Sequence, residues 1–141
     1  MTHFLDEWLI RKRGRPLLSI REARTSRFKY TRQLGARGHF AVVQLRGEPA
    51  SDFAFRSRVN WLVRGADYST AVLDGILDEL FASNLGHVVA KVHFTLEAIE
   101  WHEVDSCAVA FYHAARGAVR EILGLDTYKD HNVELPYPRR D

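Results

Sequence analysis

Apolar residues in the first half of the chain recur at every second position, the spacing typical of β-strands. Three segments predict strands, residues 17–32, 40–45 and 53–59, and the first and third show this alternation. The third alternates so regularly between apolar and polar side chains that it predicts a half-buried antiparallel strand. Two glycines within residues 33–38 predict a loop, and Gly-Glu-Pro at 47–49 predicts a turn. The first half of the chain is therefore expected to form consecutive strands.

The second half of the chain changes to the spacing of amphipathic helices. Residues 67–82 predict one helix with Asp67 as its N-cap. Residues 106–123 predict a second helix, which Asp105 caps and Gly124 ends. The expected apolar face of this second helix contains Val109, Tyr112, Ala115, Val119, Ile122 and Leu123. Each helix thus has one face suited to packing on a sheet.

A strand over 88–96, followed by a connection over 97–104, lies between the two helices in the sequence. The order is therefore strands, helix, strand, helix, with no internal repeat. One sheet with both helices on one face satisfies this order. The predicted fold class is α+β, in the form of a two-layer α/β sandwich.

Length and cysteine content narrow the class of protein. The chain has 141 residues and one cysteine, Cys107. This length fits one domain with a sizeable core. A single cysteine excludes an intrachain disulfide and a cysteine-based zinc cluster, which favours a reducing compartment. No stretch reaches the ~18 apolar residues of a membrane span, and the N-terminus lacks the features of a signal peptide. A soluble cytoplasmic domain is expected.

Charge is unevenly distributed although the net charge is only +2. Residues 1–64 carry 14 Lys and Arg against 5 Asp and Glu, whereas residues 65–141 carry 6 against 13. Residues 11–37 alone hold ten basic residues and one acid, Glu22. Arginine suits planar contact with phosphate, so this stretch suggests a polyanionic partner such as RNA. The alternative is that these arginines pair with the acidic second half, and composition alone leaves both open.

The sequence offers little for catalysis or for a cofactor. It contains no GxxxxGK[ST] phosphate loop, no GxSxG elbow and no HExxH helix. Cys107 could act as a nucleophile with His102 or His113 as base, but a lone cysteine in an apolar helical start is more often a core residue. His102, Glu103, Asp105 and His113 do not share a helical face, so no metal site is expected. The chain is expected to be neither an enzyme nor a holder of cofactor or metal.

Two segments carry more specific information. Residues 31–40 have the sequence TRQLGARGHF, and residues 101–111 have the sequence WHEVDSCAVAF. Residues 14–23, GRPLLSIREA, and the Asp-Tyr, Ala-Val and Gly-Ile pairs of 67–76 accompany them in order. Together they resemble the fourth domain of bacterial translation elongation factor G. That family has Gln-Ser-Gly-Gly-Arg-Gly-Gln-Tyr/Phe in its first loop and Tyr-His-Asp-Val-Asp-Ser-Ser in its second signature.

The resemblance implies a fold like the second domain of ribosomal protein S5. That fold has a four-stranded sheet, two helices on one face and a left-handed βαβ crossover. The resemblance covers residues 14–123. It leaves residues 1–13 as an N-terminal extension, in which 2–11 could form a short helix, and residues 124–141 as a C-terminal tail.

The resemblance also implies a site. In the family both signature loops lie at a tip that enters the ribosomal decoding site and contacts the tRNA–mRNA duplex. A glycine-flanked arginine lets the backbone approach RNA closely, and a histidine beside a tryptophan offers a stacking face. The expected RNA-binding residues of the two loops are Arg37, Gly38, His39, Trp101, His102 and Ser106. The basic residues expected to contact phosphate are Arg24, Arg27, Lys29 and Arg32.

Some positions depart from the family pattern. Ala36 replaces a glycine, His39 replaces a glutamine, and Cys107 replaces a serine. Glu100 and Glu103 flank His102 and would weaken attraction to phosphate there. The resemblance includes no GTPase domain, so neither GTP-driven translocation nor nucleotide binding is expected.

Two functional hypotheses follow. The first is a stand-alone, non-catalytic relative of this fourth domain that binds structured RNA or the ribosome through its two loops. The alternative is a protein-interaction module that kept the scaffold without RNA binding and self-associates, as a homodimer, through its complementary charges. A third hypothesis, a domain excised from a full-length factor, stays open.

Overall fold

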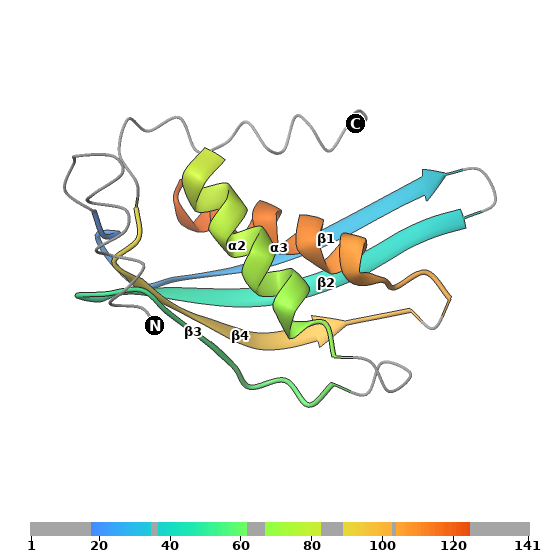
Figure 1. The fold of residues 1–141 in the computed structure, drawn as a ribbon, viewed down its shortest axis with the longest axis horizontal. Coiled ribbons are helices and arrows are strands. Elements are labelled where there is room, and N and C mark those ends of the chain that lie inside the picture. Colours follow the sequence, from blue (N-terminus) through green and yellow to red (C-terminus); the bar gives the residue numbers. More distant parts are fainter. Residues whose placement is uncertain (1–17, 35–36, 62–66, 83–88, 103, 125–141) are drawn as a thin grey trace.

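Four strands form one sheet in the described part of the chain, and two helices cover one of its faces (Figure 1). The computed structural model describes residues 18–34, 37–61, 67–82, 89–102 and 104–124. The elements occur in the order β1 (Arg24–Leu34), β2 (Arg37–Pro49), β3 (Ala54–Ser57), α2 (Ser69–Ala82), β4 (Val92–Glu100) and α3 (Ala108–Ile122). The predicted two-layer α+β architecture is confirmed.

The sheet is mixed, with the strand order β1-β2-β4-β3. The β1–β2 and β2–β4 pairs are antiparallel, whereas β3 and β4 are parallel. Helix α2 joins these two parallel strands across the face on which α3 also lies, and the crossover is left-handed, as the resemblance implied (Figure 1). The antiparallel pairing predicted for residues 53–59 is wrong, because α2 returns the chain to the end of the sheet at which β3 begins.

The hydrophobic core lies between the helices and the sheet. Phe28 and Tyr30 of β1 are buried, Phe28 against Gly117 of α3 and Tyr30 in a stack with His113 at 4.9 Å between ring centroids. The alternating residues Arg27 and Lys29 are exposed on the opposite side. We call this opposite side, which α2 and α3 do not cover, the open face. The single parity of apolar residues in β1 therefore marks its core side.

The turn predicted at 47–49 is wrong, because Gly47 lies inside β2 and beneath α3. A Cβ on Gly47 would lie 3.1 Å from Cγ2 of Ile122 and 3.3 Å from the ring of Phe94. This glycine serves close packing rather than a turn. Residues 33–38 are also mostly strand, since β1 and β2 pair residue by residue up to Leu34 and Arg37.

Strand boundaries differ from the prediction where the alternation is interrupted. A β-bulge interrupts the β2–β4 ladder, since Gln44 faces Ala98 and the next residue, Leu45, faces Leu96, which leaves Glu97 as the extra residue. The bulge breaks the alternation along β4, which occupies residues 92–100 rather than 88–96. Strand β1 likewise begins later than residue 17, and Leu18 forms only an isolated bridge with Val89.

Two of the three residues predicted to cap a helix do so in the structure. The backbone N–H of Ser69 donates to Oδ1 of Asp67 at 2.8 Å, which confirms Asp67 as a capping residue. Hydrogen bonds from the Ser69 side chain, and then from its backbone N–H, lower the pKa of the Asp67 carboxyl. Gly124, at φ 81°, ends α3 in the left-handed region. Asp105 does not cap α3, whose N-cap is Cys107 without a side-chain bond. The Asp105 carbonyl instead accepts the backbone N–H of Phe40.

The two helices approach each other closely around a buried charge. A Cβ on Gly75 would lie 2.4 Å from the carbonyl oxygen of Tyr112, so a glycine is needed in the middle of α2. Glu79 is fully buried and forms ion pairs with Arg116, at 3.0 Å, and with Arg120. A glycine inside a helix costs roughly 1 kcal/mol against alanine, and this cost is offset by the close packing that Gly75 allows.

The short helix predicted at 2–11 lies outside the described residues, as do the rest of the extension and all of the tail beyond Gly124. None of the described helices is long and apolar enough to cross a membrane.

Candidate functional site

The two signature loops lie at the same end of the sheet. Figure 1 shows the closing end of the β1–β2 hairpin beside the segment that follows β4. We call this end the tip, and define it as residues 31–34 and 37–40 of the hairpin together with residues 101, 102 and 104–107. The elements that position it are the two longest strands of the sheet and the first turn of α3.

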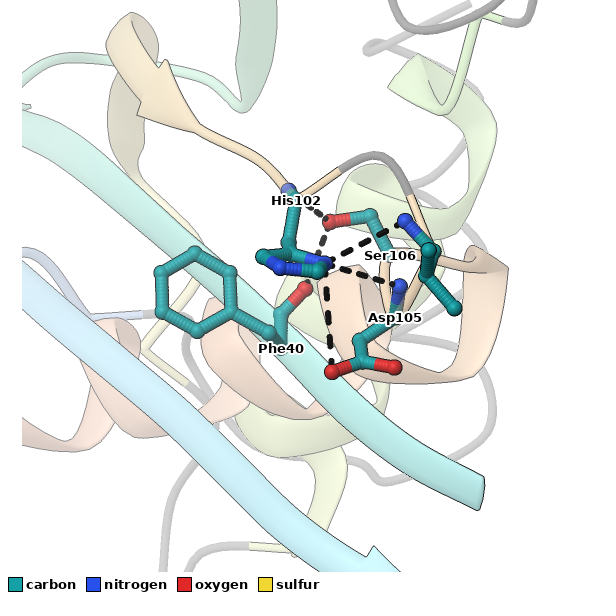
Figure 2. A network of polar contacts seen from close by, with 5 residues as sticks. Phe40, His102, Asp105 and Ser106 are labelled. Carbon is teal, nitrogen blue, oxygen red and sulfur yellow. Dashed lines mark hydrogen bonds and ion pairs between the residues drawn. The ribbon is translucent and has the colours of Figure 1, made fainter. Parts of the chain in front are cut away.

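The tip is held together at Phe40 of β2 (Figure 2). The Phe40 backbone N–H donates to the carbonyl oxygen of Asp105 at 3.1 Å. The Phe40 carbonyl accepts a hydrogen bond from the hydroxyl of Ser106 at 2.7 Å. Because both backbone groups of Phe40 are used, residues 105–106 lie directly against β2.

Ser106 connects the loop to itself as well as to β2. Its hydroxyl accepts the backbone N–H of His102 at 2.9 Å, and its own N–H donates to the His102 carbonyl at 3.1 Å. The hydroxyl thus both donates and accepts within the protein. Of the residues expected to contact RNA, Ser106 is placed to hold the loop rather than to reach outward.

His102 presents its ring to solvent in a defined orientation. Its Nδ1 accepts the backbone N–H groups of Val104, at 3.2 Å, and Asp105, at 3.3 Å. An accepting Nδ1 carries no proton, so the proton of the neutral ring lies on Nε2. The side chain is 56% exposed. The ring meets that of Phe40 edge-on, with 6.3 Å between centroids (Figure 2).

Apolar side chains are exposed around this histidine. Trp101 is 39% exposed, Val104 76% and Val109 49%. Val109 was expected on the apolar face of α3, but the buried face begins with Ala110 and Phe111. Val104, at the tip, and Val109, in the first turn of α3, were not foreseen as exposed residues, because an apolar residue type by itself predicts burial.

The glycine of the first loop allows this close contact between loops. A Cβ on Gly38 would lie 3.0 Å from Oδ2 of Asp105 and 3.2 Å from Oε1 of Gln33. His39 is half-buried and faces Arg32 across the hairpin register. Arg37 is the first residue of β2, and its side chain lies outside the described part of the structure.

The four basic residues expected to contact phosphate do not lie together. Lys29 lies beside the tip, with Nζ 5.8 Å from the centroid of the Phe40 ring, and Arg32 lies within the tip. Arg27 forms an ion pair with Glu100 on the open face. Arg24 lies at the opposite end of β1, where its Nη1 donates to the carbonyl of Ile122 at 3.1 Å. Lys29 and Arg32 are thus the two placed near both loops.

The side chains considered for catalysis or metal binding are separated. Cys107 packs, partly buried, against the core, and His113 stacks on Tyr30 rather than approaching His102. Within the described ranges, no three His, Cys, Asp or Glu side chains are grouped closely enough to hold a metal ion.

Comparison with known proteins places this arrangement in one family. The family model described as elongation factor G, domain IV, matches residues 17–124. The match includes all six strands and helices of the described structure and both loops of the tip.

Similar proteins cover this chain but extend far beyond it. "Elongation factor G 1" of Syntrophomonas wolfei subsp. wolfei is 41% identical over 96 residues, which are 67% of this chain and 14% of that protein. "Elongation factor G" of Carsonella ruddii is 34% identical over 110 residues, or 74% of this chain and 16% of that protein. A crystal structure from Thermus thermophilus superposes with a TM-score of 0.69 at 31% identity, covering 75% of this chain and 16% of that one. The chain spans about one-seventh of the length of these proteins.

Proposed function

This chain belongs to the elongation factor G domain IV family, and from that premise we propose that it acts in translation by binding structured RNA at the ribosome through its tip. The binding is non-catalytic and needs no cofactor, metal or nucleotide. Because ribosomes lie in the cytoplasm, the proposal also places the protein there.

The observation that carries the proposal is the fixed presentation of His102 at the tip. Backbone and serine hydrogen bonds hold its loop against β2, while the ring itself is 56% exposed. With Nδ1 occupied by backbone N–H groups, Nε2 is the ring atom left to meet a partner. An exposed ring beside Trp101 suits stacking on bases, and a pre-ordered loop loses little entropy on binding.

Charge favours the hairpin side of the molecule over the helix side. Lys29 and Arg32 lie at or beside the tip, and Arg37 begins β2 there. Helix α2 instead carries the exposed acids Asp74 and Asp78. Phosphate is therefore attracted toward the hairpin and repelled from α2.

Co-sedimentation with ribosomes across a salt series tests the proposal. We expect binding at low salt that weakens steeply as salt rises, because each neutralised phosphate releases counterions. Replacing Arg37 and His102 together by alanine should weaken binding further. Lys29→Ala should reduce the slope of log affinity against log salt by about 1.

Arg21→Ala provides a matched control, since it removes one exposed positive charge before β1, at the end of the strand opposite the tip. It should change ribosome affinity much less than Lys29→Ala. Undetectable affinity for ribosomes or RNA at low salt, or affinity indifferent to the tip substitutions, would contradict the proposal. A salt-sensitive dimer without RNA affinity in sedimentation would favour the protein-interaction alternative.

A further inference from the structure

An open cavity of about 380 Å³ lies on the hairpin side of the tip, between β1, β2 and the loop after β4. We call it the hairpin cavity. Its volume lies within the range of small-ligand sites. The residues that matter for its chemistry are Thr31, Arg32, Gln33, Gly38, Phe40 and Asp105.

Two polar side chains lie close to Gly38, one of the residues that line the cavity. Oδ2 of Asp105 and Oε1 of Gln33 lie 3.0 and 3.2 Å from the point that a Cβ on Gly38 would occupy. Asp105 and Gln33 come from different loops of the tip, and the Asp105 backbone is fixed by its bond from Phe40. A carboxylate oxygen and an amide oxygen therefore lie close over Gly38, and both residues line the cavity.

A carboxylate is an unexpected group in a surface that binds phosphate. An ionised carboxylate only accepts hydrogen bonds, and it repels phosphate oxygens. It does accept N–H groups, and two parallel N–H donors fit its two oxygens best. Among the described residues, the Asp105 carboxylate lies 3.8 Å from Nδ1 of His102. That distance is too long for a hydrogen bond, so the carboxylate keeps capacity for a ligand.

Residues in and beside the hairpin cavity also suit the aromatic base and the phosphate of a nucleotide. Phe40 adds an aromatic side chain, and the Nζ of Lys29 lies 5.8 Å from its ring centroid. Arg32 lines the cavity from β1, the same strand as Lys29. An aromatic ring suits contact with a base, and the Lys29 cation beside it suits a neighbouring phosphate.

We propose that the hairpin cavity binds an unpaired guanine of the RNA, with the Asp105 carboxylate accepting the N–H groups of the base. This rests on the proposed RNA binding by the tip and names the base that one part of the tip selects. Guanine presents two adjacent N–H donors, at N1 and N2, on its Watson–Crick edge. Adenine and cytosine present an amino group beside an acceptor, and uracil presents one N–H. The guanine must be unpaired, because pairing would occupy that same edge.

Fluorescence anisotropy with labelled single-stranded hexanucleotides of uridine tests this inference. One central position carries guanine, inosine, adenine or cytosine. Guanine should bind about tenfold more tightly than adenine, and inosine, which lacks the N2 amino group, should fall between them. The Asp105→Asn variant should lose this preference. Its affinity for the all-uridine RNA should not fall, because a negative charge has been removed.

Asp74→Asn serves as the control with the same change of charge on the exposed side of α2, and it should keep the guanine preference. Wild-type protein that binds all the RNAs equally, or Asp105→Asn protein that still prefers guanine, overturns the inference and leaves the proposed function standing. Absence of binding to any RNA, and to ribosomes, overturns the proposed function itself. Guanosine monophosphate that binds as tightly as the guanine hexanucleotide would assign the cavity to free nucleotides and overturn the RNA assignment.

Discussion

Different kinds of contact hold together the tip and the interface between the helices α2 and α3. Between the helices, side chains make the structure, since Glu79 is buried with Arg116 and Arg120, and Gly75 leaves no room for a Cβ beside Tyr112. At the tip, backbone groups and one serine hydroxyl make the structure. The large side chains there are left partly exposed.

This difference separates stability from the proposed function. Replacing a side chain between the helices leaves a cavity, a clash or an unpaired charge, each of which costs stability. Replacing an exposed side chain at the tip leaves the backbone bonds in place. Substitutions at the helix interface should therefore alter unfolding, and most substitutions at the tip should alter binding alone.

The largest effect on unfolding is expected for Glu79→Ala. It leaves Arg116 and Arg120, which are 28% and 15% exposed, without their buried partner. We expect a loss of about 3 kcal/mol in the free energy of unfolding, measured by urea denaturation. Asp74→Ala, on the exposed side of the same helix, should change it by less than about 0.5 kcal/mol. A similar small loss for both variants would show that the buried ion pair does not stabilise the interface.

An intermediate effect is expected for Ser106→Ala, the tip substitution that should not follow the general rule. It removes the hydrogen bond to the Phe40 carbonyl and the acceptor of the His102 N–H, and should cost about 1 kcal/mol of unfolding free energy. It should also lower ribosome affinity, because the loop is no longer held against β2. Hydrogen exchange of the His102 amide should become faster.

Ser106→Thr keeps the hydroxyl and should restore both the slow exchange and the affinity. Ser106→Ala protein with unchanged exchange at His102 and unchanged affinity would show that the Phe40 backbone bond to Asp105 alone positions the loop.

The smallest effect is expected from the pH dependence of Tyr112, at the outer edge of the helix interface. Burial, and then the hydrogen bond from its hydroxyl to Asp78, raise the pKa of Tyr112 above its ordinary value of 10.0. A raised pKa in the folded state favours the neutral phenol. Its contribution is therefore fully present below about pH 10 and is lost as pH rises through the folded-state pKa.

Tyr112→Phe should accordingly be less stable than wild type by about 0.5 kcal/mol at pH 8, with the difference shrinking above pH 10. Urea denaturation at several pH values measures it. A difference that stays constant into the alkaline range would mean that the hydroxyl contributes through packing rather than through its proton.

Much of the architecture could be predicted because its signals are local. Alternation in β1 gave the parity that buries Phe28 and Tyr30, and Asp67 caps its helix as its position suggests. The predictions that are wrong concern positions whose structure depends on contacts with distant segments of the chain. Gly47 has the residue type of a turn but packs against Ile122, and a bulge at Glu97, set by pairing with β2, interrupts the alternation of β4. The pattern of residues along the chain shows neither the Gly47–Ile122 contact nor the pairing of β2 with β4.

The candidate site was predictable as a set of residue types but not as a set of roles. The two loops were named from their sequences, and the structure places them side by side. Ser106, expected at the RNA, instead bonds Phe40 and His102. Arg24 and Arg27 are engaged with Ile122 and Glu100. A hydrogen bond needs its partner in three dimensions, so sequence could not assign these residues to one task or the other.

Local residue pattern was enough to specify the two layers and the helices, and the family signature marked the two segments of the tip, because each depends on neighbours within a few residues along the chain. Long-range packing was needed to establish that β3 runs parallel to β4, that glycines 47 and 75 serve close approach, and that Asp105 and Gln33 meet above Gly38. Periodicity reports which side of an element is buried, whereas pairing direction, close approach and converging polar atoms depend on residues far apart in the chain.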